Sequence, residues 1–207
     1  MGSLTSLSIA GSTEVEKMRI GALLLAAGFS SRFGGVKLLA ALDSGTRVFD
    51  QTYARLQAAV PEIVVLTRPE LSSELDATAR RVEVFSEAER GMGATLAFGM
   101  QFTGGWDACM ICLSDMPFIA SDTYRTLAEQ ATSDSILLPE CDGKTGNPVV
   151  FGSAFFSELG KLSGDAGGKV LIRQHPDKVI KLELQDRAIL MDIDTPQDLA
   201  QLQASQS

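Results

Sequence analysis

Histidine and cysteine are scarce in this 207-residue chain, which has one histidine and three cysteines. His175 has no cysteine pair to join, so the ligands of a structural zinc site are missing and we expect a surface-loop residue. Three cysteines are too few for a disulfide framework, and this usage is typical of a reducing compartment, which predicts a cytoplasmic protein. Cys109 and Cys112 lie three apart in an apolar run that predicts a buried strand, so we expect core thiols facing opposite sides.

Long hydrophobic runs are also missing. Glycines and charged residues interrupt each apolar run before it reaches the roughly 20 residues that a membrane-spanning helix needs. Residues 1–17 are rich in Ser, Thr and Gly and lack the positively charged start of a secretory signal. We therefore expect a flexible leader over 1–17, a single domain over 18–207 and no membrane partner.

Positive charge is in short supply, because 18 Lys and Arg face 26 Asp and Glu, which gives a formal net charge of -8 and a pI near 4.7. This balance argues against a nucleic-acid partner held by bulk phosphate electrostatics. Any phosphate must be held locally by a few cations, by backbone amides or by a metal ion.

Short aliphatic or β-branched runs predict strands at 20–26, 63–67, 82–85, 108–113, 136–139 and 149–151. Segments with helical spacing lie between them, such as Phe49 to Ala59 and a helix over Tyr124 to Ala131 with Ser121 as its N-cap. Strands that alternate with helices predict a three-layer α/β fold with a mostly parallel, doubly wound, Rossmann-like sheet. Its ligand crevice should lie at the carboxyl ends of the strands.

A glycine-rich segment follows the first predicted strand, and its glycines bracket two cations, Arg32 and Lys37. Glycine lets the backbone approach a ligand closely, and amides and cations together attract a triphosphate. The segment matches neither the dinucleotide fingerprint nor the Walker A loop. An ordinary strand-to-helix turn with solvated Arg and Lys is the alternative.

Carboxylates stand at two further strand ends. Asp115 ends the most apolar strand, and Asp192 and Asp194 lie two apart, so in a strand they share a face toward the crevice. Carboxylates with substrate phosphates are the usual ligands of Mg²⁺, which makes these three residues candidate metal ligands. The alternatives are a turn-forming role for Asp115 and a helix N-cap at Asp194 or Thr195, with Pro196 in the first helical position.

Six short motifs follow one another along the chain: L-A-A-G-x-S-x-R-x-G-x-x-K at 25–37, G-M-G-A-T-L at 91–96, L-S-D-M-P at 113–117, G-N-P-V at 146–149, G-D-A-G at 164–167 and D-I-D-T-P-x-D-L at 192–199. Their order resembles that of molybdenum cofactor nucleotidyltransferases, and the resemblance covers nearly everything after Lys17. Ala27, where the guanylyltransferase branch tends to carry a second glycine, makes the chain resemble the cytidylyltransferase branch. The resemblance implies the fold of nucleotide-diphospho-sugar transferases.

It also implies an activity, namely Mg²⁺-dependent transfer of CMP from CTP to the terminal phosphate of molybdopterin, with release of pyrophosphate. By carry-over, Arg32 and Lys37 hold the triphosphate, Asp115 with Asp194 or Asp192 binds the metal, and Asn147 and Asp165 face the acceptor. The nucleotide-binding positions are Leu25, Ala26, Ala27, Gly28, Ser30, Ser31, Gly91 and Thr95. A molybdoenzyme or its chaperone is the implied recipient of the finished cofactor.

The chain departs from the family pattern at Lys169, where Arg is common, and at Ser86-Glu87, where Asn-Pro is common. The alternatives are a GTP-using relative, a transferase for another phosphorylated acceptor and a nucleotide-binding regulator without catalysis. Gly91 and Gly93 also allow an interpretation without a nucleotide, in which they simply precede a helix that begins at Ala94. We expect Met92 to be a packing residue at that helix end.

Overall fold

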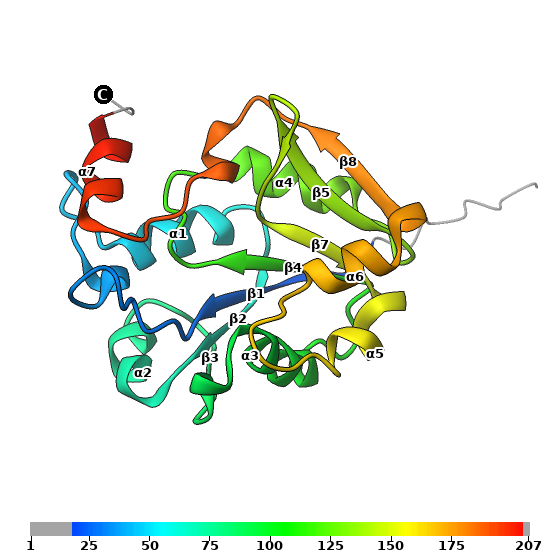
Figure 1. The fold of residues 1–207 in the computed structure, drawn as a ribbon, viewed down its shortest axis with the longest axis horizontal. Coiled ribbons are helices and arrows are strands. Elements are labelled where there is room, and N and C mark those ends of the chain that lie inside the picture. Colours follow the sequence, from blue (N-terminus) through cyan, green and yellow to red (C-terminus); the bar gives the residue numbers. More distant parts are fainter. Residues whose placement is uncertain (1–17, 205–207) are drawn as a thin grey trace, which may run out of the picture.

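The computed structural model describes residues 18–204, so the expected leader over 1–17 lies outside the described residues. A mixed sheet forms its centre, in the order β3-β2-β1-β4-β7-β5-β6, with β8 paired to β5 (Figure 1). The strands are β1 (Ile20–Ala26), β2 (Glu62–Thr67), β3 (Val82–Val84), β4 (Ala108–Leu113), β5 (Ile136–Cys141), β6 (Lys144–Thr145), β7 (Val149–Gly152) and β8 (Val179–Glu183). β1 is parallel to β2 and β4, and β2 is parallel to β3, which confirms the expected α/β fold with a mostly parallel sheet.

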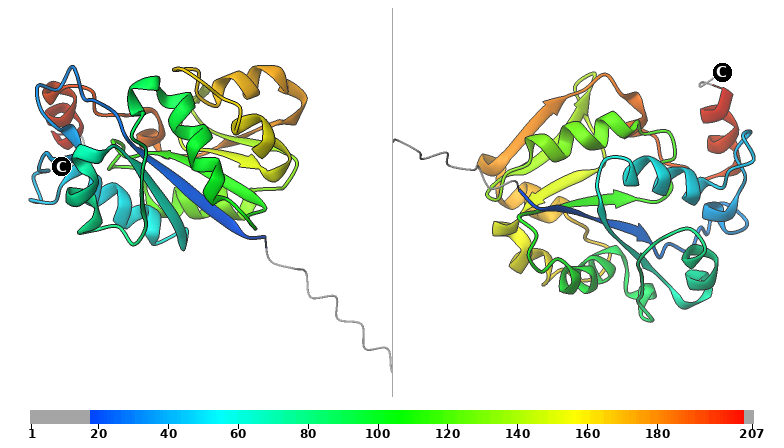
Figure 2. Two further views of the ribbon diagram at one scale, coloured as in Figure 1. Left: turned by 90° about the horizontal axis from the view of Figure 1, so that it is seen from below. Right: turned by 180° about the vertical axis from the view of Figure 1, so that it is seen from behind.

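Helices cover both faces of this sheet and complete the three layers (Figure 2). Buried side chains of α1 and α4 pack in one apolar cluster, and those of α3, α5 and α6 pack in a second cluster on the opposite face. The helices are α1 (Val48–Gln57), α2 (Pro69–Asp76), α3 (Met92–Gly99), α4 (Ser121–Gln130), α5 (Phe156–Leu159), α6 (Lys169–Gln174) and α7 (Pro196–Ala204).

The alternation of side chains along β1 and β4 explains the two clusters. Leu24 belongs to the first cluster and Leu23 to the second, because successive strand residues point to opposite faces. Cys112 and Cys109 divide in the same way, and both are buried. The expectation of core thiols facing opposite sides is therefore confirmed at this pair, and burial raises the pKa of Cys109 to about 12.

One of three local expectations is wrong. Residues 149–151 form a strand as expected, and β7 runs antiparallel to β4 and β5 within the mostly parallel sheet. The N-cap of α4 is Ala120 instead of Ser121, because the Asp186 carboxylate accepts from the Ala120 N–H at 2.9 Å and from the Thr123 hydroxyl. His175 lies in a loop at the surface as expected, and it is partly covered because its ring packs on Phe155 and its Nε2 lies 3.0 Å from a Glu158 oxygen.

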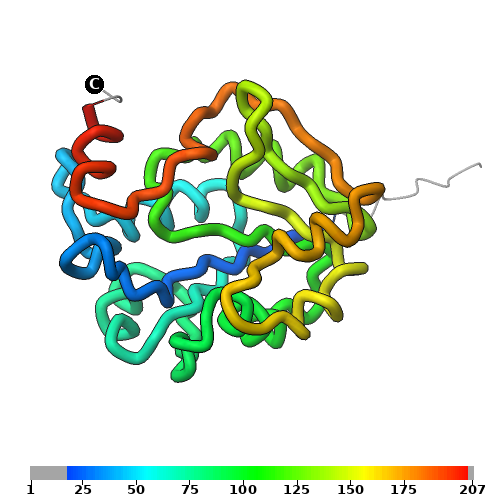
Figure 3. The backbone as a smooth tube through the Cα atoms, viewed as in Figure 1, coloured from blue at the N-terminus to red at the C-terminus, as the bar shows by residue number. Residues whose placement is uncertain are grey.

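The last described helix returns to the beginning of the fold. α7 lies beside the segment that follows the β1 loop, where the Asp43 N–H donates to the Gln203 side chain (Figure 3). Leu199 of α7 is buried in the same cluster as Leu38 and Leu42. This packing brings the residues before α7 to the carboxyl end of β1. None of the helices formed by residues 18–204 combines the length and apolar character needed to cross a membrane.

Candidate functional site

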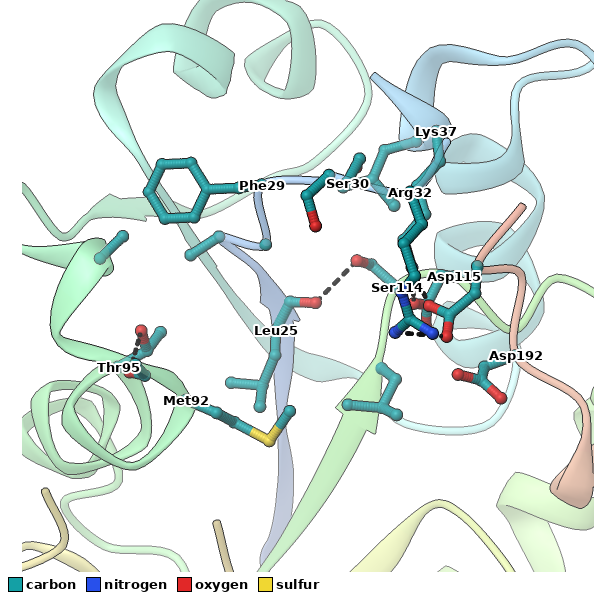
Figure 4. A pocket seen from close by; sticks show the side chains of 18 of the residues that line it. Leu25, Phe29, Ser30, Arg32, Lys37, Met92, Thr95, Ser114, Asp115 and Asp192 are labelled. Carbon is teal, nitrogen blue, oxygen red and sulfur yellow. Dashed lines mark hydrogen bonds and ion pairs between the residues drawn. The ribbon is translucent and has the colours of Figure 1, made fainter. Parts of the chain in front are cut away.

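A cavity of about 430 Å³ opens at the carboxyl ends of β1 and β4, the edge at which parallel α/β sheets bind ligands (Figure 4). The Ser114 hydroxyl donates to the Leu25 carbonyl at 2.7 Å and ties the ends of the two strands together. The lining residues are Leu25, Ala27, Gly28, Phe29, Ser30, Ser31, Arg32, Lys37, Leu38, Ala88, Gly91, Met92, Thr95, Leu113, Ser114, Asp115, Asp165, Asp192 and Asp194.

The loop after β1 forms one wall of the cavity. It turns tightly at Ser30, whose φ is +52°, and the Phe33 N–H donates to the Ser30 carbonyl at 2.9 Å. Lys37 begins a short 3-10 turn, Lys37–Leu39, and its neighbour Leu38 is buried in the core. This anchor fixes the backbone from which the Lys37 side chain enters the cavity.

Lys37 joins the loop to the acidic strand ends. Its Nζ lies 2.6 Å from Asp115 Oδ2 and 3.2 Å from Asp194 Oδ1, and its side chain is only 12% exposed. Burial lowers the pKa of Lys37, but the charges and hydrogen bonds of the two carboxylates outweigh burial and raise the pKa above its ordinary value. The Arg32 guanidinium contacts Asp194 at 2.8 Å from a more exposed position. Two cations therefore meet the carboxylates at one end of the cavity.

Asp115, Asp192 and Asp194 bring ligand atoms within 4.8 Å of one another. Asp115 Oδ1 is buried and has no hydrogen-bond partner, whereas Oδ2 contacts Lys37. Burial raises the pKa of Asp115 above its ordinary value, against the opposing effect of Lys37. An unpaired buried oxygen beside two other carboxylates suits a divalent cation that prefers oxygen ligands, so these residues fit a metal ion of the Mg²⁺ type.

The segment with Asp192 and Asp194 is not a strand, so the expectation that a strand places them on one face is wrong. Its backbone hydrogen bonds do not pair it with a strand of the sheet. The Ile193 N–H donates to the Asp115 carbonyl at 3.1 Å, and the Asp194 N–H donates to the Asp198 carboxylate. The Asp198 N–H in turn donates to the Thr195 hydroxyl at 3.2 Å, a capping box at the start of α7. The bond from Ile193, instead of a strand, brings both carboxylates to Asp115.

The start of α3 forms the other wall. The helix begins at Met92 instead of Ala94, after Gly91 with φ +99°, and the Gly93 N–H donates to the Gly164 carbonyl at 2.7 Å. A Cβ on Gly91 would lie 2.4 Å from Asp165 Oδ1, so only glycine allows this close approach. The 164–167 turn thus places Asp165 at the cavity, and Thr95 lines it one helical turn further on.

Two of the residues that the resemblance points to do not line the cavity. Ala26 is buried in β1, with its carbonyl accepting from the Thr67 hydroxyl at 3.2 Å. Asn147 lies outside the lining, where its N–H donates to the Ile189 carbonyl at 2.9 Å. The acceptor role of Asn147 and the nucleotide role of Ala26 thus find no support in the cavity lining.

Sequence reasoning missed Phe29 and Met92 as lining residues. The expectation of a packed Met92 is wrong, because the residue is 47% exposed and lines the cavity. Both residues lie inside the motifs that point to the site, but an apolar side chain in a loop carries no signal of its exposure. Only the fold distinguishes a packing residue from a cavity wall.

A family model described as "MobA-like NTP transferase domain" matches residues 22–179. No curated protein matches the chain. The structure is similar to that of Rv0371c from Mycobacterium tuberculosis H37Rv, with 25% identity, a TM-score of 0.80 and coverage of 90% of this chain and 98% of that one. A second structure of Rv0371c, described as a complex with manganese, is 24% identical, with a TM-score of 0.76 and coverage of 91% and 100%. The molybdopterin-guanine dinucleotide biosynthesis protein A from Archaeoglobus fulgidus is 19% identical, with a TM-score of 0.65 and coverage of 90% and 100%.

Proposed function

This chain belongs to the family of MobA-like NTP transferase domains, and on that premise we propose that it transfers CMP from CTP to the terminal phosphate of molybdopterin. Pyrophosphate is the second product. The observation that carries the proposal is the meeting of Lys37 with Asp115 and Asp194 in one cavity. Nucleotidyl transfer needs cations for the triphosphate and carboxylates that would hold a divalent metal ion, and it needs both at the same place.

The chemistry explains why a chain with one histidine suffices. A phosphate monoester has its second pKa near 6, so at neutral pH the acceptor is already largely an anionic nucleophile and needs no strong general base. What opposes the reaction is repulsion between the acceptor and the triphosphate, and the negative charge that builds up on the departing pyrophosphate. The site must therefore stabilise charge and align the acceptor with the leaving group.

We assign that work to the charged end of the cavity. Lys37 and Arg32 hold the phosphates of the leaving group and offset their charge. Asp115, with Asp194 and Asp192, holds Mg²⁺, and the structure described as a manganese complex supports a divalent cation in a similar protein. A divalent cation at that point supplies charge neutralisation on the phosphate oxygens.

The remaining walls take the nucleoside and the acceptor. Leu25, Ala27 and Gly28, followed by Ser30 and Ser31, present the backbone of the β1 loop to the nucleotide. Gly91 and Thr95 bound the nucleoside end from the side of α3. Asp165, at the same cavity, faces the acceptor. Ala27 supports CTP as the donor, because the guanylyltransferase branch tends to carry glycine there.

The test is Mg²⁺-dependent pyrophosphate release from each of the four NTPs, with and without molybdopterin. We expect release only with CTP and molybdopterin together, and formation of the cytosine dinucleotide. Release with GTP would assign the chain to the guanylyltransferase branch, and release only with a different phosphorylated acceptor would replace molybdopterin. Nucleotide binding without release under any condition would identify a regulator and overturn the proposal. The Lys144→Ala variant, altered at an exposed lysine outside the cavity, serves as a control for Lys37→Ala.

A further inference from the structure

Large apolar side chains are conspicuously exposed at the cavity. Among residues 18–204, four large hydrophobic side chains are exposed, and two of them, Phe29 at 54% and Met92 at 47%, line this one cavity. The other two, Val84 and Ile180, lie outside it. An apolar side chain that stays in water at a concave site has contact area to offer a ligand.

Most of the charge in the cavity lies at one end, where Arg32, Lys37 and the carboxylates of Asp115, Asp192 and Asp194 gather. At the other end, the charge in the cavity lining is that of Asp165, beside Gly91. Figure 4 shows Phe29 well away from Arg32 and Asp115, on the side of the cavity where Thr95 lies. A nucleoside triphosphate also has most of its charge at one end, in the triphosphate chain, and a planar, uncharged ring at the other. If the triphosphate chain lies at the end with Arg32 and Lys37, the nucleobase lies at the end with Phe29.

Arg68 contacts the Phe29 ring from outside the cavity. Its guanidinium carbon lies 4.8 Å from the ring centroid, within the range of a cation–π contact. The Arg68 side chain is only 13% exposed and contacts Glu70 at 3.3 Å, at the start of α2. A largely buried guanidinium therefore lies against the ring, while Phe29 as a residue remains 54% exposed. A ring that is already held in place loses less conformational entropy when a ligand stacks on it.

We propose that Phe29 is a stacking platform for the nucleobase, with Arg68 as its positioning residue and Met92 as an apolar contact from the α3 side. This inference rests on the proposed function only in taking a nucleoside triphosphate as the ligand. Stacking accepts any base, because every base has a π-face, so Phe29 supplies affinity and leaves the choice among bases to other contacts.

The experiment compares NTP binding with binding of inorganic tripolyphosphate, a probe without a base, by calorimetry in the presence of Mg²⁺ and without acceptor. We expect Phe29→Ala to weaken binding of CTP and GTP by a similar factor of about tenfold, the usual range for loss of one stacked base. Binding of tripolyphosphate should not change. Phe29→Trp should restore NTP binding, and Ile180→Ala, at an exposed site outside the cavity, should leave both ligands unaffected.

Arg68 is tested through its coupling to Phe29. Arg68→Gln should weaken NTP binding in the wild-type background and have no further effect in the Phe29→Ala background, because it acts through the ring. Equal weakening of NTP and tripolyphosphate by Phe29→Ala would overturn the inference, as would an additive effect of Arg68→Gln. The wild type could bind NTP without turnover, with Phe29→Ala weakening NTP binding and leaving tripolyphosphate binding unchanged. That result would support the stacking platform and refute the proposed transfer. A wild-type protein that binds no NTP would overturn both.

Discussion

Replacing Lys37 by alanine removes the ammonium that lies 2.6 Å from Asp115 and 3.2 Å from Asp194. The three neighbouring carboxylates, including Asp192, then repel one another without a buried counter-charge. Without metal, we expect the variant to fold but to be less stable than the wild type. With metal, we expect a cation to compensate for the missing ammonium.

The magnitude follows from burial. Breaking a fully buried ion pair by removing one partner costs about 3–5 kcal/mol. The side chains of Lys37 and Asp115 are 12% and 16% exposed, so solvent screens the pair slightly and we expect a loss near the lower limit, about 3 kcal/mol. A ligand at one hundred times its dissociation constant stabilises the folded state by about 2.7 kcal/mol. Saturating Mg²⁺ should therefore recover most of the loss.

The assay is urea unfolding of the wild type and the Lys37→Ala variant, each with EDTA and with Mg²⁺, beside pyrophosphate release. Transfer should fall by about a hundredfold or more even in saturating Mg²⁺, comparable to the loss of one preorganised stabilising group. Lys144→Ala should match the wild type in every measurement. A variant that is as stable as the wild type in EDTA, or that Mg²⁺ stabilises no more than the wild type, would refute the electrostatic account. Wild-type turnover would contradict the role of Lys37.

Three further outcomes can be measured, at Lys37, at Gly91 and at the cysteines. Because folding raises the pKa of Lys37, its ion pairs stabilise the fold fully below pH 10.5, and this stabilisation is lost as the pH rises through the pKa of the folded state. The difference in unfolding free energy between the wild type and Lys37→Ala in EDTA should therefore shrink above pH 10.5. Gly91→Ala should cost about 1–3 kcal/mol in urea unfolding, because φ is +99° and the added Cβ meets Asp165, whereas Gly28→Ala has open space; equal stabilities would refute this. The three buried thiols should react with a thiol reagent only after denaturation, and rapid labelling of the native protein would contradict their burial.

The sequence predicted the layout of the site because a general rule connects strand ends to ligands. Parallel strands end at one edge of a sheet, so motifs after β1 and β4 had to lie near each other. The apolar runs in these strands are long enough to identify them from residue type alone. Their ends carry Asp115 and the loop with Lys37, which are in contact in the structure.

Features that depend on distant partners were not predictable in this way. The N-cap at Ala120 comes from Asp186, 66 residues later, and no local pattern at Ser121 reports it. The sequence did not predict β8, because the run Val179–Glu183 is partly charged and mostly exposed and lacks the apolar pattern of the central strands. The exposure of Met92 depends equally on what the surrounding fold leaves uncovered.

The hydrogen bond from Ile193 to the Asp115 carbonyl has a consequence for the timing of assembly. Lys37 and Asp194 are separated by 157 positions in the chain, and synthesis delivers them in that order. A polypeptide still attached to the ribosome can form most of the sheet and yet lack the carboxylate that Lys37 and Arg32 share. The charged end of the cavity is thus completed only after synthesis has passed Asp194, and proteolytic removal of α7 together with Asp194 would return the molecule to that earlier stage.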